Sequence, residues 1–300
     1  MSKLGLISSI QHFSLGDGPG IRSTVFFKGC ALHCLWCHNP ETWKSKPELL
    51  YYENKCVGCG SCEEACPNGA HIVTQEGHIF HRERCTACGE CLKRCPTRAL
   101  EISGVSMSAE EVFAQISEDS DYYEASGGGV TFSGGEPLLQ DEFCVELARL
   151  CFEAGINVLI ETCADVPFSV FEKLLKYVKS YYIDIKAVSE TACTQYTGGS
   201  LTRIKENIAR LVALQADVTV RIPVIPGYND TEEFCRSAAK LLQELGVTKL
   251  ELLPFHRIGD SKYKALQKHY PYAEIKSLTG KDIEPFKAIF SEEGFQIIKE

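Results

Sequence analysis

The sequence predicts an α/β protein in which six β-α units form a partial (β/α)6 barrel of the TIM type, with a small α+β block inserted near its start. From residue 108 to residue 253, short apolar runs alternate with helical segments, the pattern of parallel strands joined by helices. Between residues 48 and 103 the chain is cysteine-rich and repetitive, unlike its flanks. We therefore expect a barrel domain of residues 1–47 and 104–300 and an inserted domain of residues 48–103.

The elements follow in order along the chain. Within the inserted block, His71-Ile-Val and His78-Ile-Phe predict two small strands around a turn. Ser108-Ala-Glu-Glu111 is a capping-box pattern, which predicts a helix from there to about Tyr123. The expected barrel strands are Thr24–Phe27, Gly129–Ser133, Asn157–Glu161, Tyr181–Lys186, Val218–Pro223 and Lys249–Leu253. The helices expected between the later strands are Asp141–Phe152, Ser169–Val178, Arg203–Leu214 and Thr231–Leu245.

Composition narrows the class of protein. The chain has 300 residues, of which 44% are hydrophobic and 24% charged, as expected of a globular protein with a sizeable core. Its net charge of -9 argues against a nucleic-acid partner, which would require a basic surface. No apolar run approaches the ~18 residues of a membrane helix, and the first residues do not resemble a signal peptide. We therefore expect a cytoplasmic protein without a membrane partner.

Sixteen cysteines are the most unusual feature of the composition. Eleven of them lie in three clusters before residue 96. Because a cytoplasmic chain keeps its thiols reduced, clustered cysteines indicate metal ligands and not disulfides. The other five are interpreted as residues that fill core space, although Cys163 is also a candidate for a role in the site. These five are Cys144, Cys151, Cys163, Cys193 and Cys235.

The first cluster, Cys30-x3-Cys34-x2-Cys37, has no fourth cysteine nearby. Three thiolates can hold three corners of a four-iron cluster and leave one iron without a protein sulfur. Since open metal positions bind substrates, this spacing indicates an enzyme and not an electron carrier. A zinc site completed by His33 or His38 is the alternative. The two further iron–sulfur motifs in the same chain favour the iron cluster.

The second and third clusters are a repeat, in which each run reads Cys-x2-Cys-x2-Cys-x3-Cys-Pro. This is the bacterial ferredoxin-type motif for two 4Fe–4S clusters, in which the fourth cysteine of each run ligates the other cluster. Zinc knuckles are the alternative, but the duplicated spacing and both prolines favour the clusters. Together with the first cluster, the chain is expected to hold three 4Fe–4S clusters. The ferredoxin-type ligand sets are Cys56, Cys59, Cys62 and Cys95 for one cluster, and Cys85, Cys88, Cys91 and Cys66 for the other.

The first cluster also carries a family resemblance. Cys-x3-Cys-x-aromatic-Cys is the signature of the radical S-adenosylmethionine (radical SAM) enzymes. The longer stretches around it closely resemble the glycyl radical enzyme activating enzymes, the pyruvate formate-lyase activase group. The inserted block resembles the activases of glycyl radical dehydratases, lyases and decarboxylases more than the short activase of pyruvate formate-lyase. The stretches are Asp17-Gly-Pro-Gly-Ile-Arg22, Phe26-Phe-Lys-Gly-Cys30 and Cys37-His-Asn-Pro-Glu41.

The resemblance implies the chemistry. In that family the amino and carboxylate groups of S-adenosylmethionine chelate the open iron. An electron from the reduced cluster then gives methionine and a 5′-deoxyadenosyl radical, which takes hydrogen from a glycine of a partner enzyme. It implies an oxygen-sensitive, monomeric radical SAM oxidoreductase with Cys30, Cys34 and Cys37 as catalytic ligands. Its partners would be a glycyl radical enzyme and, as electron donor, ferredoxin or flavodoxin.

Two other functions remain open. A radical SAM enzyme acting on a small molecule would need no protein substrate. A ferredoxin-like electron carrier would not cleave S-adenosylmethionine. For the inserted block, a structural or docking role competes with an electron relay, because fully ligated clusters cannot bind substrate.

Catalytic groups of a barrel lie at the carboxyl ends of its strands, and polar residues occur there. Gly134 and Gly135 would let the backbone approach a ligand closely, and Glu136 can accept from an ammonium group. The resemblance assigns this motif to the methionyl amino group. An arginine within an apolar strand needs an anion, and the carboxylate of S-adenosylmethionine is the natural partner of Arg221.

The two intervening strand ends carry further charges. Alternation puts Asp184 and Lys186 on one side of their strand, around Ile185, and a buried ion pair is the alternative interpretation. The resemblance assigns this end to the ribose and carboxylate of the cosubstrate. It also implies a monovalent-cation site at Glu161, Thr162 and Asp184, although family members often have Asp at the position of Glu161.

The resemblance places three more groups. Trp36 and His38 correspond to the residues whose backbone holds adenine, and His256 to a residue against the nucleoside. A structural histidine is the alternative for His256. The loop that meets the partner's glycine-bearing peptide corresponds to Asp17, Gly18, Gly20 and Arg22.

Overall fold

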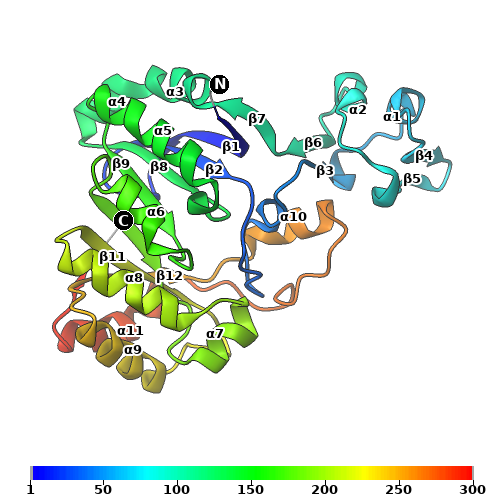
Figure 1. Cartoon of the computed structure of the whole chain (residues 1–300). Coiled ribbons are helices and arrows are strands. Elements are labelled where there is room, and N and C mark those ends of the chain that lie inside the picture. Colours follow the sequence, from blue (N-terminus) through cyan, green and yellow to red (C-terminus); the bar gives the residue numbers. More distant parts are fainter. Residues whose placement is uncertain (1–2, 299–300) are drawn as a thin grey trace.

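The computed structural model describes residues 3–298, and it is built on one nine-stranded sheet. The strand order is β13-β12-β11-β10-β9-β8-β2-β1-β7, and neighbours from β2 to β13 run parallel. The order has two edges, so the curved sheet stays open (Figure 1). All six predicted barrel strands are present. They are β2 (Arg22–Phe27), β8 (Gly129–Gly134), β9 (Val158–Thr162), β10 (Ser180–Asp184), β11 (Asp217–Val224) and β12 (Lys249–Pro254).

Helices cover the outer face of this sheet (Figure 1). In α8, Leu201, Ile204, Ile208 and Leu211 are buried at helical spacing, so one apolar stripe faces the strands. The same core contains the apolar residues of the parallel strands, for example Val220. The helices are α5 (Asp141–Glu153), α6 (Phe168–Leu174), α7 (Glu190–Thr197), α8 (Leu201–Ala213), α9 (Glu232–Glu244) and α11 (Gly280–Glu292).

The capping box forms as predicted, but the helix behind it is shorter than expected. The Ser108 hydroxyl accepts from the Glu111 amide, and the Glu111 carboxylate accepts from the Ser108 amide. The helix α3 (Ala109–Ile116) then passes through a 3-10 turn into α4 (Ser120–Ser126). The cap therefore fixes where the helix starts, whereas packing decides where it ends.

Several elements were not predicted. The long strand β1 (Leu4–Ser14) pairs antiparallel with β2 and β7 (Val105–Ser108), and β13 (Gln296–Ile297) extends the other edge. Most of the β1 residues are not buried, so the strand lacks the continuous apolar run that marks the inner strands. The short helix α10 (Asp260–Ala265) was missed as well.

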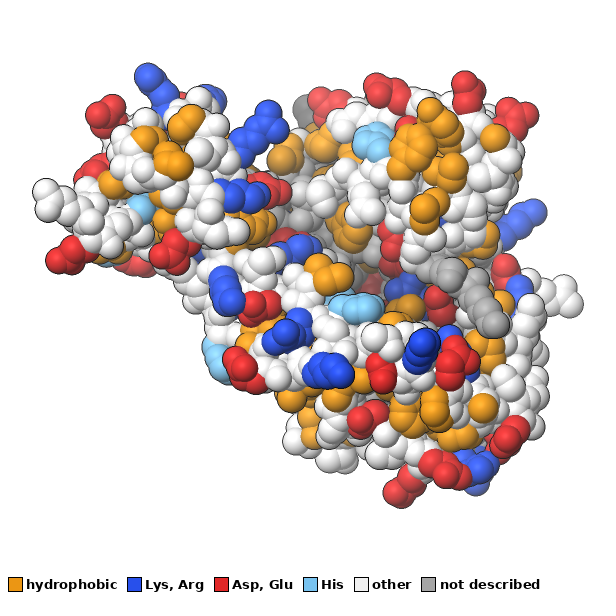
Figure 2. All heavy atoms as spheres, turned by 180° about the vertical axis from the view of Figure 1, so that it is seen from behind, with side chains coloured by type: hydrophobic (Ala, Val, Ile, Leu, Met, Phe, Trp, Pro, Cys, Tyr) orange, Lys and Arg blue, Asp and Glu red, His pale blue; other side chains and the backbone are white. Residues whose placement is uncertain are grey.

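Residues 48–103 are called here the inserted segment. The two ends of this segment lie side by side where the chain leaves the barrel and returns to it. Glu48 of β3 (Glu48–Tyr51) pairs with Ser103 of β6 (Leu100–Ser103). The predicted hairpin is present as β4 (His71–Thr74) and β5 (Gly77–Phe80). With α1 (Ser61–Ala65) and α2 (Glu90–Arg94), these elements surround their own small apolar cluster. Seen from behind, the segment is a smaller lobe beside the barrel (Figure 2).

Buried polar contacts hold the inserted segment to the barrel. The Lys28 ammonium lies 3.3 Å from a Glu48 carboxylate oxygen, and both side chains are buried. Arg82 donates to the carbonyl oxygens of Leu49 and of Ala265 at 2.7 and 2.9 Å, which joins the segment to α10. Throughout residues 3–298, every helix is too short or too polar to cross a bilayer.

Candidate active site

A cavity of about 220 Å³ opens at the carboxyl ends of the parallel strands. Cys30, Cys34 and Cys37 line it from the loop that follows β2. Backbone hydrogen bonds fix this loop: the Cys30 amide donates to Trp43, and the His33 amide to Thr197. Strand-end residues close the other sides of the cavity, namely Ser133, Gly134, Gly135, Glu161, Thr162, Asp184, Lys186, Arg221 and Pro254.

The three cysteines suit an iron–sulfur cluster. Burial raises the pKa of Cys34 to about 12 and that of Cys37 to about 11, and it also raises the pKa of Cys30. Such thiols become thiolates only beside a strong cation, and three soft sulfurs are the ligands that iron–sulfur clusters use. Their sulfurs do not all lie within 4.8 Å of one another. Tetrahedral zinc, with Zn–S bonds of about 2.3 Å, would hold them closer together, so the spacing favours the cluster.

Two glycines let the backbone of β8 approach the cysteine loop. Gly134 has a φ of +108°, and a Cβ there would lie 2.5 Å from the Phe27 amide nitrogen. A Cβ on Gly135 would lie 2.3 Å from the Gly29 carbonyl oxygen. Only glycine fits at either position, and the close approach seen here is to the protein backbone at Phe27 and Gly29; an approach to a ligand stays a prediction.

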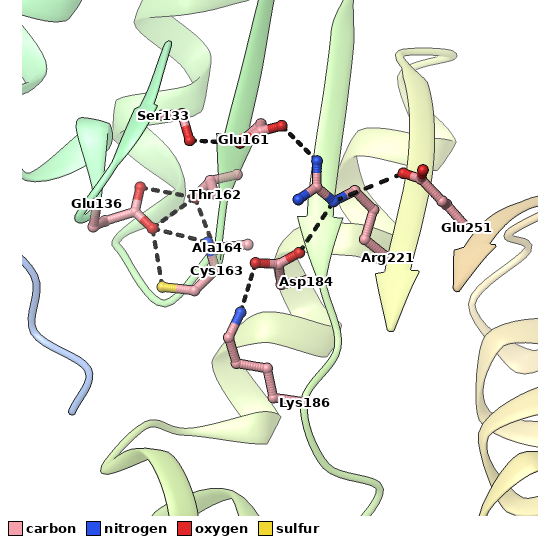
Figure 3. A network of polar contacts seen from close by, with 10 residues as sticks. All are labelled: Ser133, Glu136, Glu161, Thr162, Cys163, Ala164, Asp184, Lys186, Arg221 and Glu251. Carbon is pink, nitrogen blue, oxygen red and sulfur yellow. Dashed lines mark hydrogen bonds and ion pairs between the residues drawn. The ribbon is translucent and has the colours of Figure 1, made fainter. Parts of the chain in front are cut away.

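The Glu136 carboxylate differs from expectation, because it is not part of the cavity lining and points toward Thr162 and Cys163 (Figure 3). It is 1% exposed and accepts from the Thr162 hydroxyl, the Cys163 amide and the Cys163 thiol, at 2.8 to 2.9 Å. Burial raises the pKa of Glu136, although these hydrogen bonds oppose the change. Its oxygens are therefore already paired, and Glu136 ties the β8 and β9 ends together and is not a free acceptor for an ammonium group.

Arg221 is the centre of a charge network (Figure 3), of which Arg221, Glu161 and Asp184 line the cavity. Its guanidinium donates to Glu161 at 2.5 Å, and its Nε lies 3.6 Å from Asp184 and 3.8 Å from Glu251. Ser133 donates to the second oxygen of Glu161 at 2.5 Å. Arg221 therefore already has anionic partners within the protein, in addition to any carboxylate that enters the cavity.

Asp184 and Lys186 form the buried ion pair that was the alternative interpretation, with 2.6 Å between the carboxylate and the ammonium. Both also line the cavity. Burial alone would lower the pKa of Lys186, but Asp184 outweighs it and raises this pKa. Burial opposes ionisation of Asp184, yet Lys186 and Arg221 lower its pKa. Both groups are therefore charged at neutral pH, and each can still face a ligand.

Of the remaining predicted site residues, some lie at the cavity and one is buried in the core. Trp36 and His38 line the cavity, and the Trp36 ring packs 5.1 Å from that of Tyr228. His256 lies just beyond the lining, with its ring 6.5 Å from that of His38. The Ile185 side chain is fully buried in the core, so only its backbone, which donates to the Arg221 carbonyl oxygen, is near the site.

The expected partner-peptide loop is partly internal. The Asp17 carboxylate accepts from the hydroxyls of Ser14 and Thr24, both at 2.6 Å. Arg22 is 1% exposed and donates to Thr131 and to the Val130 carbonyl oxygen. The Arg22 side chain therefore holds β2 to β8, and it does not face a partner as expected.

The eight cysteines of the inserted segment line two small cavities. Each cavity contains the first three cysteines of one run and the fourth of the other, which are the two groups that the cross-ligation rule assigns. One is lined by Cys56, Cys59, Cys62 and Cys95, and is called cavity A; the other is lined by Cys66, Cys85, Cys88 and Cys91, and is called cavity B.

Comparisons with known proteins agree with this site. The radical SAM superfamily model matches residues 80–241, slightly more than half of the chain, and a 4Fe-4S dicluster domain model matches residues 55–100. The choline trimethylamine-lyase activating enzyme of Oleidesulfovibrio alaskensis is 37% identical over 99% of this chain and 98% of its own. The trans-4-hydroxy-L-proline dehydratase activating enzyme of Clostridioides difficile is 39% identical over 97% of both chains. This chain belongs to the glycyl radical enzyme activating enzymes.

The family determines the reaction of this activating enzyme. When bound, a reduced 4Fe–4S cluster and S-adenosylmethionine supply the 5′-deoxyadenosyl radical that takes hydrogen from a glycine of a glycyl radical enzyme. The fold agrees as well. A radical SAM methyltransferase from Sphaerobacter thermophilus superimposes with a TM-score of 0.51, at 17% identity, over 71% of this chain and 61% of that one. The superfamily match begins after Cys37, so the roles of the first three cysteines rest on their motif and on the cavity.

Two site residues escaped the sequence analysis. Glu251 lies mid-strand in β12 and is 4% exposed, and a single acidic residue within Leu250-Glu-Leu-Leu253 was the available signal. Ser133 was noted only as part of the Ser-Gly-Gly-Glu motif, but its hydroxyl binds Glu161. The other four isolated cysteines are buried as predicted, and Cys163 is a hydrogen-bond donor to Glu136.

Proposed function

We propose that this activating enzyme serves a glycyl radical enzyme of the dehydratase, lyase or decarboxylase type, in the cytoplasm of an anaerobic cell. One observation carries the proposal: the sulfurs of Cys30, Cys34 and Cys37 share a cavity with the carboxyl ends of the parallel strands. Relatives at 36–41% identity are named for activating lyases, dehydratases and decarboxylases, which supports the partner type. The chain would act as a monomer.

In this proposal the three cysteines hold three irons and leave the fourth open for the amino and carboxylate groups of S-adenosylmethionine. Because the Glu136 carboxylate is already paired, the backbone at Gly134 and Gly135 would take the ammonium group. Lys186 and Arg221, which both line the cavity, would face the carboxylate. The backbone of Trp36 and His38 would hold adenine, with His256 beside the nucleoside.

A monovalent cation at Glu161, Thr162 and Asp184 belongs to the same proposal. Three carboxylates, from Glu161, Asp184 and Glu251, face only two basic groups in this network. Because the pKa of Glu251 is raised to about 7, the excess negative charge develops as Glu251 ionises, and a cation would then balance it. It would, however, compete with Arg221 and Ser133 for the Glu161 oxygens.

For the protein substrate, the backbone of Gly18 and Gly20, with Asp17, would meet the glycine-bearing peptide. The internal position of Arg22 supports a role in shaping this loop. The inserted segment, residues 48–103, would form a ferredoxin-like domain with two 4Fe–4S clusters that carry electrons from ferredoxin or flavodoxin to the barrel cluster. A structural or docking role for the segment is the rival.

Electron paramagnetic resonance tests the main proposal. Anaerobic, reduced protein is mixed with S-adenosylmethionine and each member of a panel of purified glycyl radical enzymes. We expect a glycyl doublet with one member, lost in Cys34→Ala but retained in Cys235→Ala, which replaces a buried cysteine on α9. Abundant 5′-deoxyadenosine without a doublet from any member would instead favour a small-molecule substrate.

The relay is tested with two electron sources. Cys59→Ala and Cys88→Ala each remove an exposed ligand of one ferredoxin-type cluster. A relay predicts that cleavage of S-adenosylmethionine falls at least tenfold with reduced flavodoxin but little with dithionite, which can reduce the barrel cluster directly. Full activity with flavodoxin in both variants would refute the relay, and an equal loss with both reductants would favour the structural role.

A further inference from the structure

Two histidines lie between the cavities of the inserted segment. His71 on β4 and His78 on β5 face each other across the hairpin, and their Nδ1 and Nε2 atoms are 2.9 Å apart. His78 lines cavity A, whereas His71 lines cavity B. One hydrogen-bonded pair of imidazoles therefore connects the two cysteine sets. In the sequence these histidines only marked the two strands.

The pair also contacts the sulfurs of cavity A. His78 Nδ1 lies 3.6 Å from the Cys56 sulfur, and His78 Nε2 lies 3.7 Å from the Cys62 sulfur. Packing holds both rings in place. His71 is 1% exposed and stacks on Phe80 at 5.0 Å, and the His78 ring lies 4.4 Å from that of Tyr51.

The hydrogen-bonding inventory fixes the direction of these contacts. A metal-bound thiolate only accepts hydrogen bonds, and a neutral imidazole has one N–H and one acceptor nitrogen. If His78 carried its hydrogen on Nε2, its bare Nδ1 would face the Cys56 thiolate, acceptor against acceptor. With the hydrogen on Nδ1 of both rings, His71 donates to His78 Nε2 and His78 donates to Cys56. His78 Nε2 then accepts from His71 at 2.9 Å and makes no hydrogen bond to the Cys62 sulfur, which lies farther away at 3.7 Å, whereas Nδ1 has the Cys56 sulfur as its partner.

The two cavities differ in the hydrogen-bond donors that face their cysteine sulfurs. Among the described residues, the donors to the cavity B sulfurs are backbone amides: the Ala87 amide donates to Cys85 at 3.4 Å and the Ala70 amide donates to Cys66 at 3.3 Å. In cavity A, the Ser61 hydroxyl lies 3.5 Å from the Cys59 sulfur, in addition to the His78 contact. Hydrogen bonds to cluster sulfurs raise the reduction potential, because they stabilise the more negative reduced cluster.

We propose that His78 donates a hydrogen bond to the Cys56 thiolate, and that this bond raises the reduction potential of the cluster in cavity A. His71 is a positioning residue, because it holds His78 in the tautomer that can donate. The inference rests on the proposed function of the inserted segment as a two-cluster domain. The two clusters would then differ in reduction potential, although the repeated cysteine motif makes them look equivalent in the sequence.

The test is an anaerobic redox titration followed by electron paramagnetic resonance on the full-length, reconstituted protein. His78→Phe keeps a ring against Tyr51 but removes both nitrogens. At a fixed potential we expect the ratio of reduced to oxidised cluster A to fall about tenfold, which is about 59 mV for one electron. His71→Phe should shift the same cluster in the same direction by less. His81→Phe is the matched control, since its imidazole contacts Glu83 and no cysteine.

Double variants assign the potential shift of His78→Phe to one cluster. The shift should persist when His78→Phe is combined with Cys88→Ala, which removes a cavity B ligand, and vanish when it is combined with Cys59→Ala, which removes a cavity A ligand. His78→Phe protein that keeps its clusters at the wild-type potentials would overturn the inference. If His78→Phe fails to assemble, His71→Phe decides, and an unchanged potential there overturns it equally. Wild-type protein that binds iron for fewer than three clusters would instead refute the two-cluster function of the inserted segment.

Discussion

Glu251 should make this enzyme less stable as the pH rises through neutrality. Its side chain is buried in β12, next to a network that already holds Glu161 and Asp184 (Figure 3). Burial raises the pKa of Glu251 to about 7 from an ordinary 4.5, although Arg221 opposes the change. The folded state therefore binds more protons than the unfolded state between these two values. Stability from this group is complete below pH 4.5 and is lost as the pH rises through 7.

The size of the effect follows from the two pKa values of Glu251. Linkage predicts a loss of roughly 1.4 kcal/mol in the free energy of unfolding between pH 6 and pH 8.5. Glu251→Gln removes the titration and with it this slope. The variant also loses the ion pair with Arg221, but this pair forms only when Glu251 is ionised, so its pH dependence is already contained in the pKa of Glu251. The difference between the two slopes is therefore the quantity to measure.

The assay is thermal unfolding under anaerobic conditions at pH 6, 7, 8 and 8.5. Relative to wild type, the melting temperature of Glu251→Gln should rise by about 3 °C across this range, at roughly 2 °C per kcal/mol for a chain of this size. Glu172→Gln removes one carboxylate from an exposed position and serves as the control for net charge. Parallel curves for wild type and Glu251→Gln would refute the reasoning.

Three further substitutions test other contacts. Arg22→Met leaves two buried acceptors, on Thr131 and Val130, without their donor. It should cost about 3 kcal/mol in urea unfolding, and a loss below about 1 kcal/mol would contradict the internal role. Glu136→Gln places an N–H against the amide of either Cys163 or Leu138, and it should cost about 2 kcal/mol and weaken S-adenosylmethionine binding in equilibrium dialysis. Unchanged values for both would argue against the tie between β8 and β9. Ser108→Ala removes the α3 cap and should cost about 1 kcal/mol without changing S-adenosylmethionine binding.

Local sequence patterns predicted the strands with continuous apolar runs and the helices with a regular spacing of apolar residues. The parallel strands are short apolar runs because both of their faces are covered, and the capping box of Ser108 and Glu111 marked the start of α3. The antiparallel strand β1 lacks such a run, since it faces the core with only part of its length. Its pairing with both β2 and β7 is a long-range property that no local window contains.

The sequence by itself determined which atoms can bind iron, because cysteine spacing along a loop limits how sulfurs can meet around a cluster. It also placed the polar residues at the strand ends, since strand direction and alternation are local. Only the tertiary structure decided the direction of each side chain. Glu136 and Arg22 turned out to be internal, and Arg221 turned out to share its charge with three carboxylates. Buried charges must be paired, and their partners come from strands far apart in the sequence, so the pairing exists only once the chain has folded.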